Sequence, residues 1–124
     1  MMNEELKTLH LQSISHPMAI DAYERLSAAC ESRAGGMSES EQMLIADYCR
    51  AEDVKQLMLA DIAKRGLGKE KANGRQSYWQ KNESVPGLRA QVEQQRKILN
   101  ELKLTPASRK LDAVPVEDDD FDKF

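Results

Sequence analysis

Aromatic side chains are scarce in this chain. Phe, Trp and Tyr make up 5% of its 124 residues, although 40% of the residues are hydrophobic. A core with so few rings has to be built from Leu, Ile, Met and Ala, and most of these residues suit helices. One domain is expected at this length, and small domains bury a limited share of their surface. The composition predicts a mainly α-helical protein for which association would add stability.

Cysteine is also scarce, and long apolar runs are missing. Cys30 and Cys49 are the two cysteines, and they show no paired metal-ligand spacing. Buried free thiols in a reducing compartment are a simpler interpretation than a disulfide. No apolar run reaches the roughly 18 residues that suggest a membrane helix. The first ten residues, MMNEELKTLH, lack the profile of a signal peptide, so we expect no membrane partner.

The residues that catalysis would need are not assembled. His10 and His16 lie six positions apart, which does not place them on one helical face, and no third ligand stands nearby. Gly68 and Lys69 are followed by Glu70, where a P-loop has Ser or Thr. Ser, Cys and His do not form a persuasive nucleophilic set. We predict no catalytic residues, no metal and no cofactor, and hence no enzyme.

Helical periodicity dominates what is present. A short helix or frayed arm is expected within 1–14, and the apolar spacing predicts a second helix over about 17–33. The stretch SESE at 38–41 is a capping box for a long helix that Gly66 ends. Another helix is expected over about 86–103, antiparallel to the long one. The expected divisions are an N-terminal helical arm at 1–36, a helical oligomerisation core at 37–112 and a disordered acidic tail at 113–124.

The long helix is apolar on more than one side. Between Met43 and Ala63, 14 of 21 residues are apolar or aromatic. One stripe suffices to pack a helix onto a monomer core, so we interpret the excess as a surface shared between subunits. The stripes consist of Leu44, Tyr48, Ala51, Met58 and Ile62; of Met43, Val54 and Leu57; and of Ile45, Cys49 and Leu59. The residues predicted to carry oligomerisation are Leu44, Ile45, Tyr48, Leu59 and Ile62.

A basic hairpin or ordered loop is expected at 66–81, because Asn73-Gly74 is a strong signal for a tight turn. Residues 64–81 hold six basic side chains against one acidic side chain, a net charge of +5, with Tyr78 and Trp79 among them. Such clusters attract phosphate backbones, although a basic hairpin is also common edge protection. The predicted DNA-binding residues are Lys64, Arg65, Lys69, Lys71, Arg75 and Lys81.

The order of these parts resembles a known family. The chain carries IADYCRAEDV in its long helix, NESVPGL before the next helix, the box LKLTPASRKL, and an acidic end DDDFDKF. It is similar to the small subunit of tailed-bacteriophage terminases that close with a Leu-Thr-Pro-x-Ser-Arg box. The box residues are Thr105, Pro106, Ser108 and Arg109.

The resemblance implies a function. Small terminase subunits bind viral double-stranded DNA, form oligomeric rings, present the DNA to the large ATPase and nuclease subunit and regulate that subunit, in the cytoplasm of the infected bacterium or of a lysogen. The end of the chain, with a net charge of −4 over 117–124, is predicted to dock on that large subunit. The residues expected to do so are Asp118, Asp119, Asp120, Phe121 and Phe124.

Two alternatives stay open at this point. Many small terminases carry an N-terminal helix-turn-helix, and AGGMSES between two helices could be its turn, which would make the chain a DNA-binding regulator. A helical adaptor without nucleic-acid contact is the other possibility. Salt-dependent binding to duplex DNA would distinguish a DNA-binding terminase subunit from such an adaptor.

Overall fold

A computed structural model describes residues 2–105 of the protein, and within them four helices and one β-hairpin are formed. The elements are α1 (Glu4–Gln12), α2 (Pro17–Glu31), α3 (Glu39–Arg65), β1 (Gly68–Asn73), β2 (Gln76–Lys81) and α4 (Ser84–Glu101). All the expected helices are present, and the basic segment at 66–81 forms a hairpin, so the mainly α prediction is confirmed.

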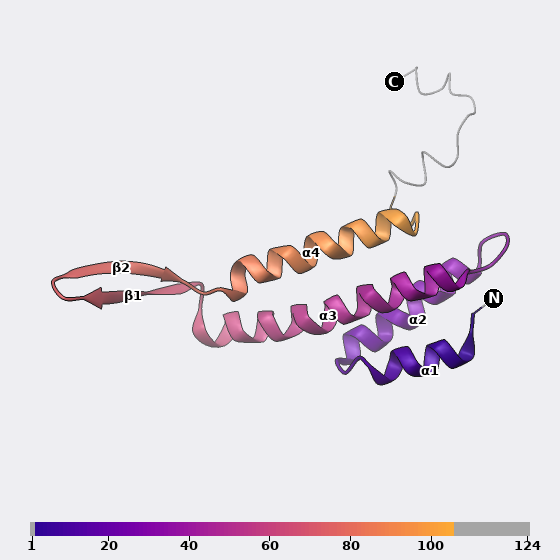
Figure 1. Ribbon diagram of the computed structural model, residues 1–124, viewed down its shortest axis with the longest axis horizontal. Helices are drawn as coiled ribbons and strands as arrows, with labels where there is room; N and C mark the ends of the chain where they lie inside the picture. The colour runs from indigo at the N-terminus through magenta and orange to yellow at the C-terminus, as the bar shows by residue number, and fades with distance from the viewer. Residues whose placement is uncertain (1, 106–124) are drawn as a thin grey trace, which may run out of the picture.

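Helix α3 is the axis of the molecule. Its 27 residues correspond to about 40 Å at 1.5 Å per residue. As Figure 1 shows, α4 runs back along α3 in the antiparallel sense, α1 and α2 lie beside the first half of α3, and the hairpin projects beyond its other end. The described molecule is therefore elongated, with its helical core at one end and the hairpin at the other.

The two ends of α3 follow the sequence signals. The Ser38 hydroxyl accepts a hydrogen bond from the Glu41 amide at 3.1 Å, and the Glu41 carboxylate accepts one from the Ser38 amide at 2.9 Å. Both halves of the predicted capping box are thus formed, and such a cap is worth about 1 kcal/mol. Gly66 ends the helix with φ +80°, a conformation that an L side chain rarely adopts.

Two side chains accept hydrogen bonds from backbone amides at the start of α2. His16 is the capping residue, and its Nδ1 accepts from the Met18 amide at 3.1 Å. The backbone amides of Ser15 and His16 instead donate to the two carboxylate oxygens of Asp53 on α3, each at 2.8 Å. This pair of bonds fixes the α1–α2 connection against the middle of α3.

The hydrophobic core lies where α1, α2, the first half of α3 and the end of α4 meet. The core is continuous between the predicted N-terminal arm at 1–36 and the predicted oligomerisation core at 37–112, because α2 and α3 both contribute side chains to it. Cys30 and Cys49 are buried there as free thiols, as expected, and burial raises the pKa of Cys49 to about 12. The buried apolar members are Ile14, Ala19, Ala22, Tyr23, Cys30, Met37, Ile45, Ala46, Cys49, Ile98 and Leu102.

A buried polar group joins α3 to α4. Glu52 on α3 is 5% exposed, and its carboxylate accepts from Gln95 of α4 at 2.9 Å and from Gln56 at 2.6 Å. Lys55 lies 3.0 Å from the same carboxylate. Burial alone raises the pKa of Glu52, but the hydrogen bonds from these three side chains outweigh it and lower the pKa. Gln56 and Lys55 share α3 with Glu52, so the contacts that depend on the relative position of the two helices are those of Gln95, which donates to Glu52 and to the Tyr48 carbonyl and accepts from Lys55. These contacts fix the register of α4 on α3.

Candidate nucleic-acid interface

A hydrogen-bonded cluster at the junction with the helices holds the base of the hairpin. Arg65, at the end of α3, forms a bidentate pair with Asp61 at 2.7 and 2.8 Å and also donates to Asn82 at 3.1 Å. The Asn82 side chain is buried and donates to the Gly66 carbonyl at 2.9 Å. Ser84, at the start of α4, donates to Asp61 at 2.7 Å. The bonds from Arg65 and Ser84 hold the pKa of Asp61 well below its usual range.

The register of the hairpin divides its side chains between two faces. Gly68 pairs with Lys81 and Asn73 pairs with Gln76, which leaves Gly74 and Arg75 as the two turn residues. Gly74 has φ +67°. Side chains alternate between the faces along a strand, and directly opposite residues share a face. One face, called the Lys–Gln face below, carries Lys69, Lys71, Asn73, Gln76, Tyr78 and Gln80; the opposite face carries Gly68, Glu70, Ala72, Ser77, Trp79 and Lys81.

The Lys–Gln face is open to solvent. All six of its residues are exposed, and Tyr78, opposite Lys71, keeps 49% of its surface. Toward the base of the hairpin the surface is hollowed into a cleft of about 380 Å³. Its lining is rich in cations and consists of Arg65, Gly68, Lys69, Lys71, Gln80, Lys81, Asn82 and Glu83. Within residues 2–105, Lys69, Lys71, Arg75 and Lys81 form no ion pair, so their charges are available to an anionic partner.

The opposite face holds the one acidic residue of the hairpin and its Trp. Trp79 lies against the backbone of Gly68, where an added Cβ would come within 2.6 Å of the indole ring. The ring nevertheless remains 58% exposed. Glycine at 68 thus leaves room for the indole to contact β1, and Trp79 stabilises the hairpin without being enclosed by it.

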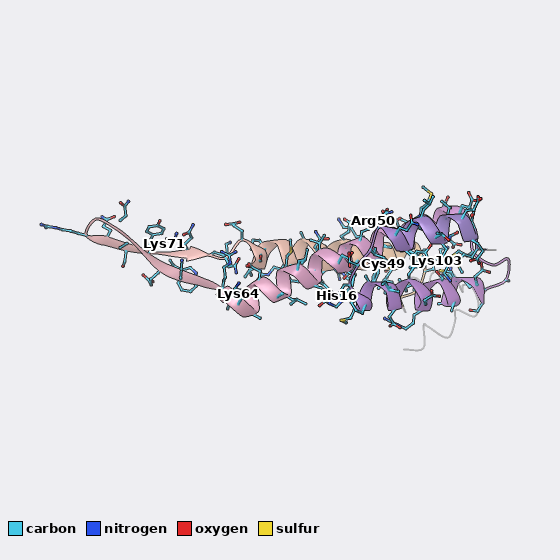
Figure 2. All side chains as sticks on the ribbon, turned by 90° about the horizontal axis from the view of Figure 1, so that it is seen from below. His16, Cys49, Arg50, Lys64, Lys71 and Lys103 are labelled. Carbon is cyan, nitrogen blue, oxygen red and sulfur yellow. The ribbon has the colours of Figure 1, made fainter. Side chains whose placement is uncertain are left out.

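The predicted DNA-binding residues are brought together at one end of the molecule, but their surroundings differ. Figure 2 shows Lys71 on the hairpin, beyond the helices, and Lys64 at the end of α3, whereas His16, Cys49 and Lys103 lie in the other half. Lys64 is exposed. Arg65 is hydrogen-bonded to Asp61 and Asn82, so it positions the base of the hairpin.

The predicted oligomerisation residues are distributed in a different way. Ile45 has 0% exposure and lies in the core of the protomer, so we remove it from the predicted intersubunit surface, because a fully buried side chain cannot contact a neighbouring subunit. Leu44 and Tyr48 also pack against that core and are partly buried. Ile62 is partly buried, and Leu59 is 41% exposed.

The most exposed apolar surface of α3 belongs to the stripe of Met43, Val54 and Leu57, and none of these three is among the predicted oligomerisation residues. Leu57 alone is 72% exposed. The other two stripes are covered more fully: Met58 lies against Gly87 of α4, and Ile45 and Cys49 lie in the core, although Leu59 remains 41% exposed. The periodicity of the sequence shows all three stripes, but only the packing of α2 and α4 shows which one is left uncovered.

The described residues also include possible metal ligands, the long helices and the first residue of the Thr105–Arg109 box. Within residues 2–105 no group of three or more His, Cys, Asp or Glu side chains is placed to hold a metal ion, and no helix there is long and apolar enough to cross a membrane. Of the box, Thr105 donates to the Asn100 side chain at 2.7 Å. Pro106, Ser108 and Arg109 lie outside the described residues, as do Asp118, Asp119, Asp120, Phe121 and Phe124.

Comparison with known families decides the class of the protein. A family model described as phage terminase, small subunit, matches residues 19–119, which is most of the chain. The chain belongs to the phage terminase small-subunit family. The predicted family membership is confirmed by the match as a whole, which spans α2, α3, the hairpin and α4. No significant match was found among curated proteins or among solved structures. Membership of the terminase small-subunit family implies a role in phage DNA packaging.

Proposed function

We propose that this small terminase subunit binds viral double-stranded DNA through its hairpin. The observation that carries the proposal is the concentration of unpaired cations on an element that projects away from the helical core. Lys69, Lys71 and Arg75 lie within a single hairpin and are exposed. Neutralising phosphates with such side chains releases counterions, which is the main source of sequence-independent affinity for DNA.

The second part of the proposal is assembly into a ring. The exposed apolar residues of α3 supply the argument, because Met43, Val54 and Leu57 form a stripe that keeps 37% to 72% of each residue's surface exposed within residues 2–105. Val92 of α4 adds to the exposed apolar surface with 48% exposure. Apolar surface of this kind is typical of contacts between subunits. Several copies in a ring would bring their hairpins to the same DNA and multiply weak contacts.

The third part concerns the terminase large subunit. We propose that the small subunit has no catalytic activity of its own and delivers DNA to the large ATPase and nuclease subunit, in the cytoplasm of the infected host. Asp118, Asp119 and Asp120 would attract a basic surface on that partner over a distance, and Phe121 and Phe124 would anchor the contact. The support here is the charge and composition of residues 117–124 together with the family.

The DNA contact is tested by a triple substitution, Lys69→Ala with Lys71→Ala and Arg75→Ala. Affinity for a mixed-sequence duplex is measured by fluorescence anisotropy over a range of salt concentrations. Each lost phosphate contact lowers the slope of log K against log salt by about 0.9, so the variant should lose about 2.7 from that slope.

A matched control removes three exposed cations elsewhere: Arg25→Ala on α2 with Arg96→Ala and Lys97→Ala on α4. Its net charge equals that of the hairpin variant, and its salt slope should stay close to that of the wild type. Equal losses in both variants would mean that DNA responds only to overall charge. An unchanged hairpin variant would move the contact to the N-terminal helices, and a wild type that binds no DNA would favour the adaptor hypothesis.

A further inference from the structure

The Lys–Gln face carries side-chain amides as well as cations. Asn73, Gln76 and Gln80 occupy it together with Lys69 and Lys71. All three amides are exposed, and within residues 2–105 none of them makes a side-chain hydrogen bond. Each amide has two N–H donors and one carbonyl acceptor in a plane. A surface that only had to attract phosphates would gain nothing from these acceptors.

The opposite face of the hairpin differs in composition. It holds Glu70, Ala72, Ser77 and Trp79, with Lys81 at its base. Glu70 would be repelled by the phosphates of a nucleic acid, and the indole of Trp79 covers Gly68. Because the strand residues of both faces are exposed apart from Gly68, a general need for solubility does not explain why all three amides and two of the three strand lysines lie on one face.

The dimensions of the hairpin suit a groove of DNA. Each strand has six residues, which is about 20 Å of extended chain. The major groove of B-DNA is about 12 Å wide and admits a two-stranded β-ribbon. The hairpin projects beyond the helices (Figure 1), so the helical core does not obstruct its approach. The minor groove, at about 6 Å, is too narrow for the ribbon without deformation of the duplex.

We propose that the Lys–Gln face enters the major groove and reads base sequence there. Gln76 and Gln80 present their amides to adenine N6 and N7, the pairing that glutamine favours, while Lys69 and Lys71 keep the phosphate contacts proposed above. Arg75, in the turn, and Lys81, at the base, contact phosphates on either side. This inference rests on the proposed DNA binding and adds to it the residues that would choose the sequence.

The test begins with the full-length wild-type protein and a pool of randomised duplexes. Repeated selection should enrich a preferred sequence. Gln76→Ala with Gln80→Ala leaves the net charge unchanged, so its salt slope should equal that of the wild type. Each of the two bidentate base contacts that the variant loses should reduce the preference for the selected duplex over a mixed-sequence duplex by about fivefold to 150-fold. Ser77→Ala, on the opposite face, is the control and should retain the preference.

A second measurement needs no variant. The selected duplex is prepared with 7-deazaadenine or 7-deazaguanine in place of single purines, which removes the N7 acceptor of the major groove and keeps base pairing. Wild-type affinity should fall several-fold at the positions that are read and stay constant elsewhere. The experiment is then repeated with Gln76→Ala and with Gln80→Ala as single variants. A purine whose deaza form lowers the affinity of the wild type but not that of one variant is the base that the missing amide contacts.

The outcomes separate this inference from the proposed function. If no sequence is enriched, if the amide variant keeps its preference, or if the deaza bases change nothing, the face does not read sequence. The triple cation variant would still weaken binding in those cases, and the hairpin would then be a phosphate-binding element alone. If the cation variant also binds normally, both proposals fail, and the Lys–Gln face becomes a candidate contact for another protein.

Discussion

His10 is a buried histidine whose surroundings favour its neutral form. Its Nδ1 lies 2.8 Å from the Tyr23 hydroxyl, which itself accepts a hydrogen bond from Gln42 at 3.1 Å. Burial, with a contribution from the nearby charge of Arg50, lowers the pKa of His10 from 6.5. In the unfolded chain the ring regains the ordinary value.

This difference makes the stability of the fold depend on pH. Because the folded pKa of His10 lies below the unfolded value of 6.5, the unfolded chain binds more protons in that interval and stability falls as the pH drops through it. Denaturant unfolding between pH ~8 and ~5 should show the free energy of unfolding constant at the upper end and decreasing below about 6.5. His10→Gln should be less stable throughout but should lose this part of the slope. A variant with an unchanged slope would assign the titration to other groups.

At the scale of the elements, the sequence predicted what local chemistry determines. The capping box at Ser38 and the glycine at 66 gave the bounds of α3 almost to the residue. The turn of the hairpin was also predicted, but its register was not. Gly74 with φ +67° fits either central position of a tight turn, and the structure places it first, before Arg75. The pairing of the complete strands determines which central position of the turn Gly74 occupies, and the Asn-Gly dipeptide alone does not.

The apolar stripes of α3 lead to a prediction about association. Leu57→Glu places a charge on exposed surface, so it should leave the protomer folded and break the oligomer. Ile45→Glu places a charge in the core, where a carboxylate has no partner, and should cost about 4 kcal/mol or more. Light scattering measures the mass of each variant, and circular dichroism with thermal unfolding measures the fold.

The pair of variants separates two explanations of a lost oligomer. A folded Leu57→Glu monomer with an unfolded or strongly destabilised Ile45→Glu protein would support the stripe of Met43, Val54 and Leu57 as the intersubunit surface. A Leu57→Glu protein that keeps the wild-type mass would place the contact elsewhere, with Leu59 and Val92 as the next exposed residues to test. A wild type that is monomeric at micromolar concentration would remove the ring from the proposal.

At the scale of the whole molecule, the sequence predicted which residues are basic but not what each cation does. Arg65 and Lys64 are neighbours with the same charge, yet Arg65 is tied to Asp61 and Asn82 while Lys64 is exposed. Asn82 and Ser84 lie 17 or more positions from Asp61 or Arg65, so only the fold shows that they meet. The Lys–Gln face depends in the same way on the strand register, which no local pattern fixed.

The layout of the molecule separates two contacts. The hairpin lies at one end of α3, and α4 ends at the other, where Leu104 packs against the core. The described part of the chain therefore ends on the side away from the hairpin. Binding of DNA at one end and of the large subunit through residues 114–124 need not compete. We expect each contact to be removable without the other.

Deletion of residues 114–124 is the variant that tests this independence. The truncated protein should keep the oligomer mass, the DNA affinity and the salt slope of the wild type, because the deletion removes none of residues 2–105. It should lose association with the large subunit in a pull-down assay. Lys69→Ala with Lys71→Ala and Arg75→Ala should show the reverse pattern, with weak DNA binding and a normal pull-down.

Phe121→Ala with Phe124→Ala leaves all five acidic residues of 117–124 in place. If apolar anchors dominate the contact, as in many small interfaces, this variant should weaken it about as much as the deletion. Substituting Asp118, Asp119 and Asp120 by Asn should instead slow association and reduce its dependence on salt. A truncated protein that still captures the large subunit with full affinity would move the docking surface onto the helices.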